Sequence, residues 1–150
     1  MARDENLHLR TRNFNLVTYA NEASIRSILK QHACKANFIF HDHDEDKKPH
    51  WHICLRLKEA TTGTAVLKWF ADAVDDDGVI QNTMIEVCNS IKSSLRYLVH
   101  LDNKDKFQYT IGSVCSWGEG AIDDFSQAVS EENKELDSAS LAVFDLLDVL

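Results

Sequence analysis

The residues best suited to chemistry in this chain are two histidines that stand one position apart, His50 and His52. They belong to residues 38–57, FIFHDHDEDKKPHWHICLRL, which hold four of the seven histidines and four acidic residues. Because side chains alternate between the faces of a β-strand, both imidazoles point to one face, and the opposite face is apolar. The spacing predicts a rigid platform for a divalent metal ion, although a bare His-x-His pair is also typical of two exposed strand histidines.

Further candidate ligands stand shortly before this pair. Residues 36–41 and 50–57 both have strand character, and the short link between them predicts an antiparallel hairpin. Such a hairpin would bring His41 and Asp44 beside the histidine pair. Two or three imidazoles with a carboxylate suit Mn²⁺, Mg²⁺, Zn²⁺ or Co²⁺ and leave coordination positions open for a substrate oxygen.

Three neighbouring residues complicate the ligand set. Cys54 shares the histidine face but lies one pair further along the strand, so we exclude it. Strict alternation would place His41 and His43 on one side and Asp42 and Asp44 on the other. Asp44 can join His41 only if the strand bends before it, and the acidic residues within 42–46 favour such a bend.

A second candidate for chemistry is Tyr97, in a segment with helical periodicity. On a helical wheel it falls about 120° from Ile91, away from the apolar stripe of Ile91, Leu95, Leu98 and Val99. It shares its face with Ser93, His100 and Lys104. With a pKa near 10, roughly one tyrosine in a thousand is ionised at neutral pH, a deficit of about 4 kcal/mol for a nucleophile. A metal, or a cation such as Lys104, would be needed to activate it, and an ordinary half-exposed tyrosine remains the alternative.

The periodicity along the chain predicts the elements that must position these residues. We expect strands at 12–19, 36–41, 50–57, 79–87 and 106–111, and helices at about 21–31, 62–74 and 90–101. Beyond residue 118, Ile122, Phe125 and Val129 predict one acidic helix, and residues 141–150 another. The fold class is therefore α+β, a central antiparallel sheet of about five strands with packed helices and an acidic helical C-terminal tail.

Length and charge fit one domain followed by a tail. The chain has 150 residues and a net charge of −8, and residues 119–150 alone carry nine acidic residues against one lysine. Acidic and basic residues are equal in number over 1–118, so the tail supplies the whole excess of negative charge. The net charge therefore weakens the case for a nucleic-acid function without excluding it. No apolar run approaches the ~18 residues of a membrane span. The four cysteines are widely spaced, which is typical of reduced thiols in a cytoplasmic protein.

Aromatic and basic residues add a weaker indication of single-stranded nucleic acid, because single-strand binders stack bases on aromatic rings and follow phosphates with cations. The aromatic candidates are Tyr19, Trp69, Phe107, Tyr109 and Trp117. The basic ones are Arg10, Arg12, Lys47, Lys48, Arg56, Arg96, Lys104 and Lys106. Most of these aromatic residues are also suited to a core, and most of the charges to a solvated surface.

Taken in order, these motifs resemble those of the HUH endonucleases, and more narrowly of the rolling-circle replication initiators of small plasmids and single-stranded DNA replicons. The matching segments are FNLVTY at 14–19, PHWHI at 49–53 and RYLVHLDNKDKFQY at 96–109, with the His-Asp-x-Asp stretch of the plasmid branch at 41–44. The resemblance covers residues 12–110. Carried over by position, it implies His41, Asp44, His50 and His52 as ligands of Mn²⁺ or Mg²⁺, and Tyr97 as the nucleophile.

The resemblance implies site-specific nicking and joining of single-stranded DNA, or of an extruded origin hairpin, through a 5′-phosphotyrosine. Many viral relatives carry a lysine three residues after the tyrosine, where this chain has His100, so either His100 or Lys104 would assist. Residues 1–118 would form the endonuclease domain, and residues 119–150 would be a tail or the start of a further region. In relatives the corresponding region leads to oligomerisation or to helicase parts, and none of helicase length is present here. We therefore expect a homo-oligomer through the C-terminal region, and the lack of a long apolar run predicts no membrane contact.

Other functions fit the same residues. A mobilisation relaxase or a single-tyrosine transposase would share the chemistry and differ in its biological role. A non-catalytic sheet domain that binds RNA or DNA through aromatic residues, with incidental histidines, is the alternative from a different class. Metal-dependent covalent capture of an oligonucleotide separates the enzymes from the binding module.

Overall fold

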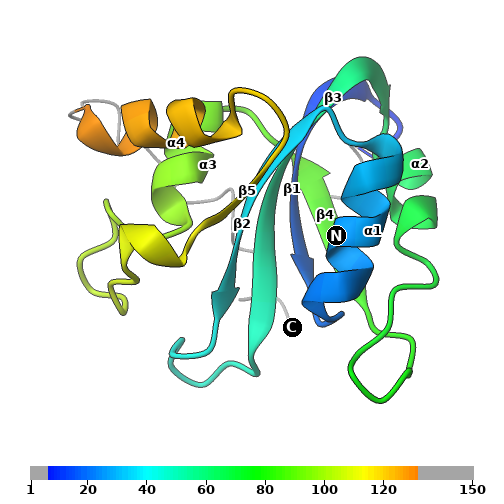
Figure 1. The fold of residues 1–150 in the computed structure, drawn as a ribbon, viewed down its shortest axis with the longest axis horizontal. Helices are drawn as coiled ribbons and strands as arrows, with labels where there is room; N and C mark the ends of the chain where they lie inside the picture. Colours follow the sequence, from blue (N-terminus) through cyan, green and yellow to red (C-terminus); the bar gives the residue numbers. More distant parts are fainter. Residues whose placement is uncertain (1–6, 132–150) are drawn as a thin grey trace.

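A computed structural model describes residues 7–131 of the chain. Five antiparallel strands form one sheet in the order β4-β1-β3-β2-β5, and helices cover it (Figure 1). The α+β class and the five-stranded antiparallel sheet predicted from the sequence are confirmed. The strands are β1 (Arg10–Thr18), β2 (Lys35–His41), β3 (His50–Thr62), β4 (Thr83–Val87) and β5 (Cys115–Trp117). The helices are α1 (Glu22–His32), α2 (Gly63–Trp69), α3 (Ile91–Tyr97) and α4 (Ala121–Ser130), with the short 3₁₀ helix η2 (Ile111–Ser113).

The strand that carries the histidine pair lies in the middle of the sheet. β3 pairs with β1 on one side, with His52 opposite Val17, and with β2 on the other, with His50 opposite His41. Because helices also cover both faces, the side chains of His50 and His52 are fully buried. The alternative of two exposed strand histidines is therefore wrong.

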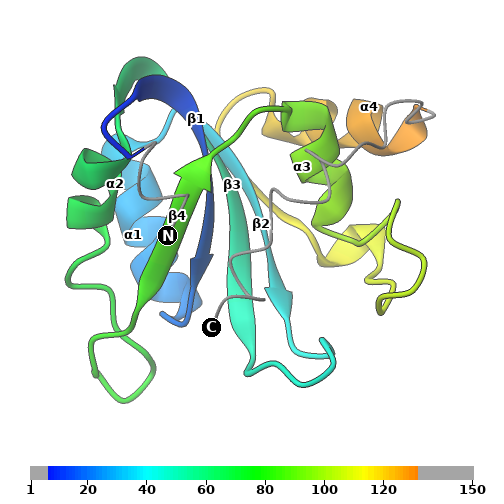
Figure 2. The same ribbon diagram turned by 180° about the vertical axis from the view of Figure 1, so that it is seen from behind.

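Two helical layers sandwich the sheet, with α1 and α2 on one face and α3 and α4 on the other (Figures 1 and 2). Under α1 and α2 lies a core that includes Phe14, Leu16, Phe38 and Ile53. Under α3 and α4 lies a smaller core built from Ile39, Cys54, Leu95, Leu98, Val99, Tyr109, Phe125 and Ala128. The histidine face of β3 therefore looks toward α3, the helix that carries Tyr97.

Polar side chains cap the first three helices, which begin close to the positions that the periodicity predicts. The Asn21 side chain accepts a hydrogen bond from the Ser24 amide at 2.8 Å, and the Thr62 hydroxyl accepts one from the Ala65 amide at 3.2 Å. The Ser90 hydroxyl caps α3 by accepting from the Ser93 amide, also at 3.2 Å. Each cap satisfies an amide that has no partner inside the helix.

The strand predicted at 106–111 is wrong, and the fifth strand is instead β5, which pairs with β2 over Ala36–Phe38. The segment after α3 forms turns and η2, because its polar groups bond within the segment and to its neighbours. The Phe107 carbonyl accepts from His100 at 2.7 Å, and the Gln108 amide group bonds to three nearby carbonyls. In a strand Phe107 and Tyr109 would share one face, whereas in this segment Phe107 is exposed and Tyr109 is buried.

The helix predicted from Ile122, Phe125 and Val129 is present as α4, and it packs against the sheet and α3. Phe125 and Ala128 are buried in the core beneath α3 and α4. Asp124 forms an ion pair with Lys35 at 2.6 Å. The helix predicted at 141–150 lies outside the described residues, and the division of the chain at residue 118 stays a prediction. Within residues 7–131, no helix is long and apolar enough to cross a membrane.

One buried arginine connects α3, the turn that follows it and the end of α4. Arg96 bonds to both carboxylate oxygens of Asp102, at 2.7 and 2.6 Å. It also donates to the carbonyl oxygens of Ala128, at 2.9 Å, and Glu131. The Arg96 side chain is 8% exposed and that of Asp102 is 14% exposed, so little water is available to replace either partner.

We predict that Asp102→Ala lowers the free energy of unfolding by about 2–4 kcal/mol, because it leaves a buried guanidinium without its carboxylate. The matched control is Glu22→Gln, which breaks the exposed pair with Arg26, whose side chains are 42% and 46% exposed. That change should cost at most about 0.5 kcal/mol. Urea unfolding followed by circular dichroism gives both values, and equal losses would contradict the prediction.

Candidate active site

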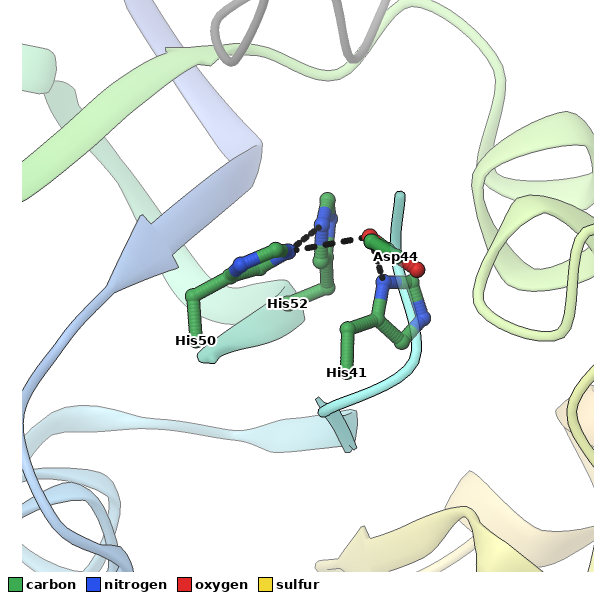
Figure 3. A group of neighbouring side chains, drawn as sticks. All are labelled: His41, Asp44, His50 and His52. Carbon is green, nitrogen blue, oxygen red and sulfur yellow. Dashed lines mark hydrogen bonds and ion pairs between the residues drawn. The ribbon is translucent and has the colours of Figure 1, made fainter. Parts of the chain in front are cut away.

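Four side chains from the β2–β3 hairpin form a compact cluster, His41, Asp44, His50 and His52 (Figure 3). One possible ligand atom from each residue lies within 4.8 Å of the others. His41 ends β2 opposite the start of β3, which places two imidazoles from neighbouring strands beside each other. Asp44 reaches them because β2 ends at His41, so the bend that the sequence required does occur.

The residues that the sequence left as alternatives lie outside this cluster. The side chains of Asp42 and His43 are 49% and 59% exposed and face each other at 3.5 Å. Cys54 is buried under α3, and it is not a member of the cluster. The structure therefore brings together the four residues that the resemblance implied.

Hydrogen bonds to backbone carbonyls fix which nitrogen of two histidines faces the cluster. His41 Nε2 donates to the carbonyl oxygen of Leu98 at 2.7 Å, and His50 Nδ1 donates to that of Lys48 at 2.6 Å. Because a carbonyl oxygen only accepts, these nitrogens carry protons, and in the neutral form of each ring the other nitrogen presents a lone pair. The two lone pairs, on His41 Nδ1 and His50 Nε2, lie 3.1 and 3.2 Å from Asp44 Oδ2.

The carboxylate of Asp44 is held in place from its outer side by Tyr109. The Tyr109 hydroxyl donates to Asp44 Oδ1 at 2.7 Å and accepts from the His43 amide at 2.9 Å. Burial opposes ionisation of Asp44, but its contacts with His41 and His50 and the bond from Tyr109 hold its pKa well below the usual range. Asp44 is therefore a carboxylate whose second oxygen, Oδ2, faces the imidazoles.

The donor set fits a divalent metal ion. The inward-facing atoms of His41, His50 and Asp44 are all acceptors, so a cation or additional protons must stabilise the arrangement. Metal–nitrogen bonds of about 2.1 Å place neighbouring ligand atoms roughly 3.0–3.4 Å apart. His50 Nε2 lies 3.2 Å from Asp44 Oδ2 and 3.0 Å from His52 Nε2. Burial and the neighbouring imidazoles lower the pKa of His52, which keeps that ring neutral, and the four residues could therefore bind a metal.

The apolar pattern predicted that the helix carrying Tyr97 runs to about Leu101. In the structure α3 already ends at Tyr97. A Schellman motif stops it: the Leu101 amide donates to the Arg96 carbonyl, and the His100 amide to the Tyr97 carbonyl. His100 adopts a left-handed conformation, with φ of 59°, at the position that glycine usually occupies. Its ring is fixed there by the hydrogen bond from Nδ1 to the Phe107 carbonyl.

This helix end turns Tyr97 toward the histidines. The centre of the Tyr97 ring lies 6.0 Å from that of His52 and 5.0 Å from that of His100. The residue is 6% exposed, unlike the half-exposed tyrosine that a helix surface would carry. The hydrogen bond between His41 and the Leu98 carbonyl ties the next residue of the chain to the cluster.

The cation beside Tyr97 is Lys106 and not Lys104. The sequence indicated Lys106 only as a candidate contact to nucleic acid. Lys106 Nζ donates to the Tyr97 hydroxyl at 2.7 Å, whereas Lys104 is exposed in the turn before it. His100 packs against the Tyr97 ring and is 2% exposed. Burial lowers the pKa of His100 to about 4, although the Phe107 carbonyl opposes this shift, so His100 is neutral at pH 7.

Sequence reasoning missed the roles of Lys106 and Tyr109 because it placed both on a regular strand. The local sequence carries no signal for these roles, because Lys106 and Tyr109 stand three residues apart and would face opposite sides of a strand. In the irregular loop, Lys106 reaches Tyr97 and Tyr109 reaches Asp44. The same loop therefore supports both halves of the site.

Comparison with known proteins assigns the chain to a family. Residues 6–123 match the family model described as "plasmid replication protein, origin binding domain". The chain belongs to this family. It is also similar to a replication protein of Staphylococcus aureus, with 24% identity over 135 residues, which is 85% of this chain and 64% of that protein. The chain thus spans less than two thirds of the length of this relative.

Membership of the origin-binding family confirms the resemblance to plasmid replication proteins that the motifs at 14–19, 41–44, 49–53 and 96–109 indicated. The description of this family names the origin-binding domain of plasmid replication proteins. The histidine–aspartate cluster, Tyr97 and Lys106 all lie within the matched residues.

We predict that Mn²⁺ binds the cluster and raises the unfolding midpoint of the protein, because a ligand that binds only the folded state stabilises it. At a hundredfold excess over the dissociation constant the gain is about 2.7 kcal/mol. Asp44→Asn removes a charged ligand while keeping its size, and it should remove most of the gain. His43→Gln, an exposed neighbour outside the cluster, is the control and should keep it. Thermal unfolding with Mn²⁺ and with EDTA tests this, and an unchanged midpoint in the original protein would refute it.

Proposed function

We propose that this origin-binding domain acts as a rolling-circle replication initiator, an HUH-type endonuclease that nicks and rejoins single-stranded DNA through a 5′-phosphotyrosine. Tyr97 is the proposed nucleophile, and His41, Asp44, His50 and His52 are the proposed metal ligands. The observation that carries the proposal is the position of Tyr97, on a separate helix, with its ring centre 6.0 Å from that of His52. A phosphodiester has to lie between a phenol and a metal site in this chemistry.

The four ligands would hold Mn²⁺ or Mg²⁺, which stabilises negative charge on a non-bridging oxygen of the scissile phosphate. The Tyr97 oxygen attacks phosphorus as the bond from phosphorus to the 3′ oxygen breaks. The phenolic proton leaves to solvent, and the 3′ oxygen takes up a proton to become a free hydroxyl. The phosphodiester energy is retained in the tyrosyl bond, so the strand can be rejoined without ATP, and the free 3′-hydroxyl can prime synthesis.

Lys106 is the proposed activating cation. Its ammonium group already donates to the Tyr97 hydroxyl at 2.7 Å, so it would stabilise the phenolate as the proton leaves. His100 is neutral at pH 7, so it provides no positive charge. Its proposed role is to position Tyr97 by packing against the ring, and Lys104 has no assigned role in this mechanism.

The proposed substrate is single-stranded DNA or an extruded origin hairpin, because the site must enclose the backbone around one phosphate. A relaxase or a transposase would use the same residues, and the match to the plasmid origin-binding family favours replication. The binding-only alternative has less support, because a sheet domain that merely binds DNA has no need of four buried, mutually oriented polar side chains. A homo-oligomer through the C-terminal region stays a prediction.

We expect Tyr97→Phe to abolish the SDS-resistant adduct between the protein and a labelled single-stranded origin oligonucleotide in Mn²⁺, while DNA binding is retained. The other two tyrosines are informative controls, because both lie near the cluster. Tyr19 has its ring centre 6.2 Å from that of His50, and Tyr109 bonds to Asp44. Tyr19→Phe should leave the adduct intact, and Tyr109→Phe should reduce but not abolish it. An adduct that persists in Tyr97→Phe and disappears in Tyr19→Phe would show that the nucleophile is misassigned.

The two lysines of the loop give a second test of the mechanism. Lys106→Met should slow adduct formation by about tenfold to a hundredfold, because removal of a charged donor from a reacting oxygen typically costs at least that much. Lys104→Met removes the same charge from an exposed position and should change the rate less than twofold. Rates are measured under single-turnover conditions with saturating protein, so that weaker DNA binding does not enter. Similar losses in both variants would indicate general electrostatic attraction instead of activation of Tyr97.

A further inference from the structure

Beside the proposed metal site, aromatic side chains line an open pocket of about 490 Å³. Its walls are Phe40, His43, Trp51, Phe107 and Tyr109. We propose that this pocket, which we call the aromatic pocket, holds an unpaired nucleobase of the bound DNA strand, next to the scissile phosphate. The inference rests on the proposed function and adds to it a site for base recognition.

The rings of the aromatic pocket form two groups that face it from different elements. On the hairpin, Phe40 and Trp51 pair across β2 and β3, with ring centres 5.2 Å apart. On the other side, the rings of His43 and Phe107 stack at 4.5 Å, with 24° between their planes. Flat apolar surfaces on several sides suit a planar ligand, and bases stack on aromatic side chains regardless of sequence.

Two of these rings remain open to solvent. Phe40 is 40% exposed and Phe107 is 47% exposed, and they belong to the small set of large apolar side chains exposed in the described chain. β5 pairs with β2 only over Ala36–Phe38, so it ends before Phe40. Exposed aromatic residues cost free energy in a monomer, and a stacked base would cover them.

The chemistry of the rim favours a base over a phosphate. Asp42 is the acidic residue of the lining, and within residues 7–131 no lysine or arginine lines the pocket, so a phosphate would be disfavoured there. Gln108, Thr110 and Ser113 supply amide and hydroxyl groups that can bond to the edge of a base. The backbone would instead follow the proposed metal site and Lys106, which lie beside the pocket.

The position of the aromatic pocket links it to the site through shared residues. Tyr109 forms one wall, and its hydroxyl bonds to Asp44. Trp51 stands between His50 and His52 on β3 but points to the opposite face, so the pocket meets the cluster through Tyr109 and not through Trp51. Phe107 directly follows Lys106, which reaches Tyr97. A phosphate held between Tyr97 and the cluster would therefore have a neighbouring base within reach of the pocket.

The test compares two labelled oligonucleotides of equal length and charge, a random-sequence single strand and a strand of the same length with abasic sugars throughout. Binding is measured by fluorescence anisotropy with the full chain in EDTA, so no cleavage occurs. We expect the original protein to bind the strand with bases more tightly. Phe107→Ala and Phe40→Ala should each weaken that binding by about fivefold to 150-fold, the range for loss of one stacked base. Binding of the abasic strand should not change.

Ile80→Ala is the matched control, since Ile80 is 61% exposed and lies outside the lining of the pocket. It should leave both affinities unchanged, and circular dichroism should show that all three variants are folded. Equal weakening of the binding of both oligonucleotides by Phe107→Ala, or no weakening of either, would overturn the pocket.

The result is independent of the nicking proposal. Formation of the covalent adduct without base-dependent binding would overturn the aromatic pocket and leave the nuclease standing. Base-dependent binding that requires Phe40 and Phe107, without any adduct in Mn²⁺, would support the pocket and overturn the nuclease.

Discussion

The hydrogen bond from His41 to the carbonyl oxygen of Leu98 joins the two halves of the site. It connects residues 57 positions apart, one at the end of β2 and the other just past α3. It satisfies a carbonyl that the end of the helix leaves without a helical partner. It also fixes the proton of His41 on Nε2, so that Nδ1 faces Asp44. One contact therefore sets both the orientation of a candidate ligand and the place of Tyr97.

The cluster is a buried polar network, and such networks are stable only when nearly every member is satisfied. Its outward-facing atoms bond to the carbonyls of Leu98 and Lys48 and to the hydroxyl of Tyr109. These partners leave mostly acceptors facing inward. Inward-facing acceptors in a dry interior cost free energy unless a cation lies between them, which is the physical reason to treat the cluster as a candidate metal site.

The loop between α3 and β5 gives the site its remaining parts. Within four consecutive residues it supplies Lys106 to the Tyr97 hydroxyl, Phe107 to the aromatic pocket and Tyr109 to Asp44. A regular strand would send Lys106 and Tyr109 to opposite faces of a sheet. The irregular backbone, held by the bond from His100 to the Phe107 carbonyl, lets both side chains reach the same site. The left-handed conformation of His100 is thus part of how this loop is placed.

From the sequence alone came the α+β fold, the hairpin with His50 and His52 on one face, and the approximate starts of the first three helices, because alternation and helical periodicity depend on neighbours in the chain. It also selected the cluster and Tyr97 as candidates, through the motifs. Only the tertiary structure decided that β5 rather than residues 106–111 completes the sheet, and that Lys106 rather than Lys104 meets Tyr97. These outcomes depend on hydrogen bonds between segments distant in sequence, which no local periodicity records.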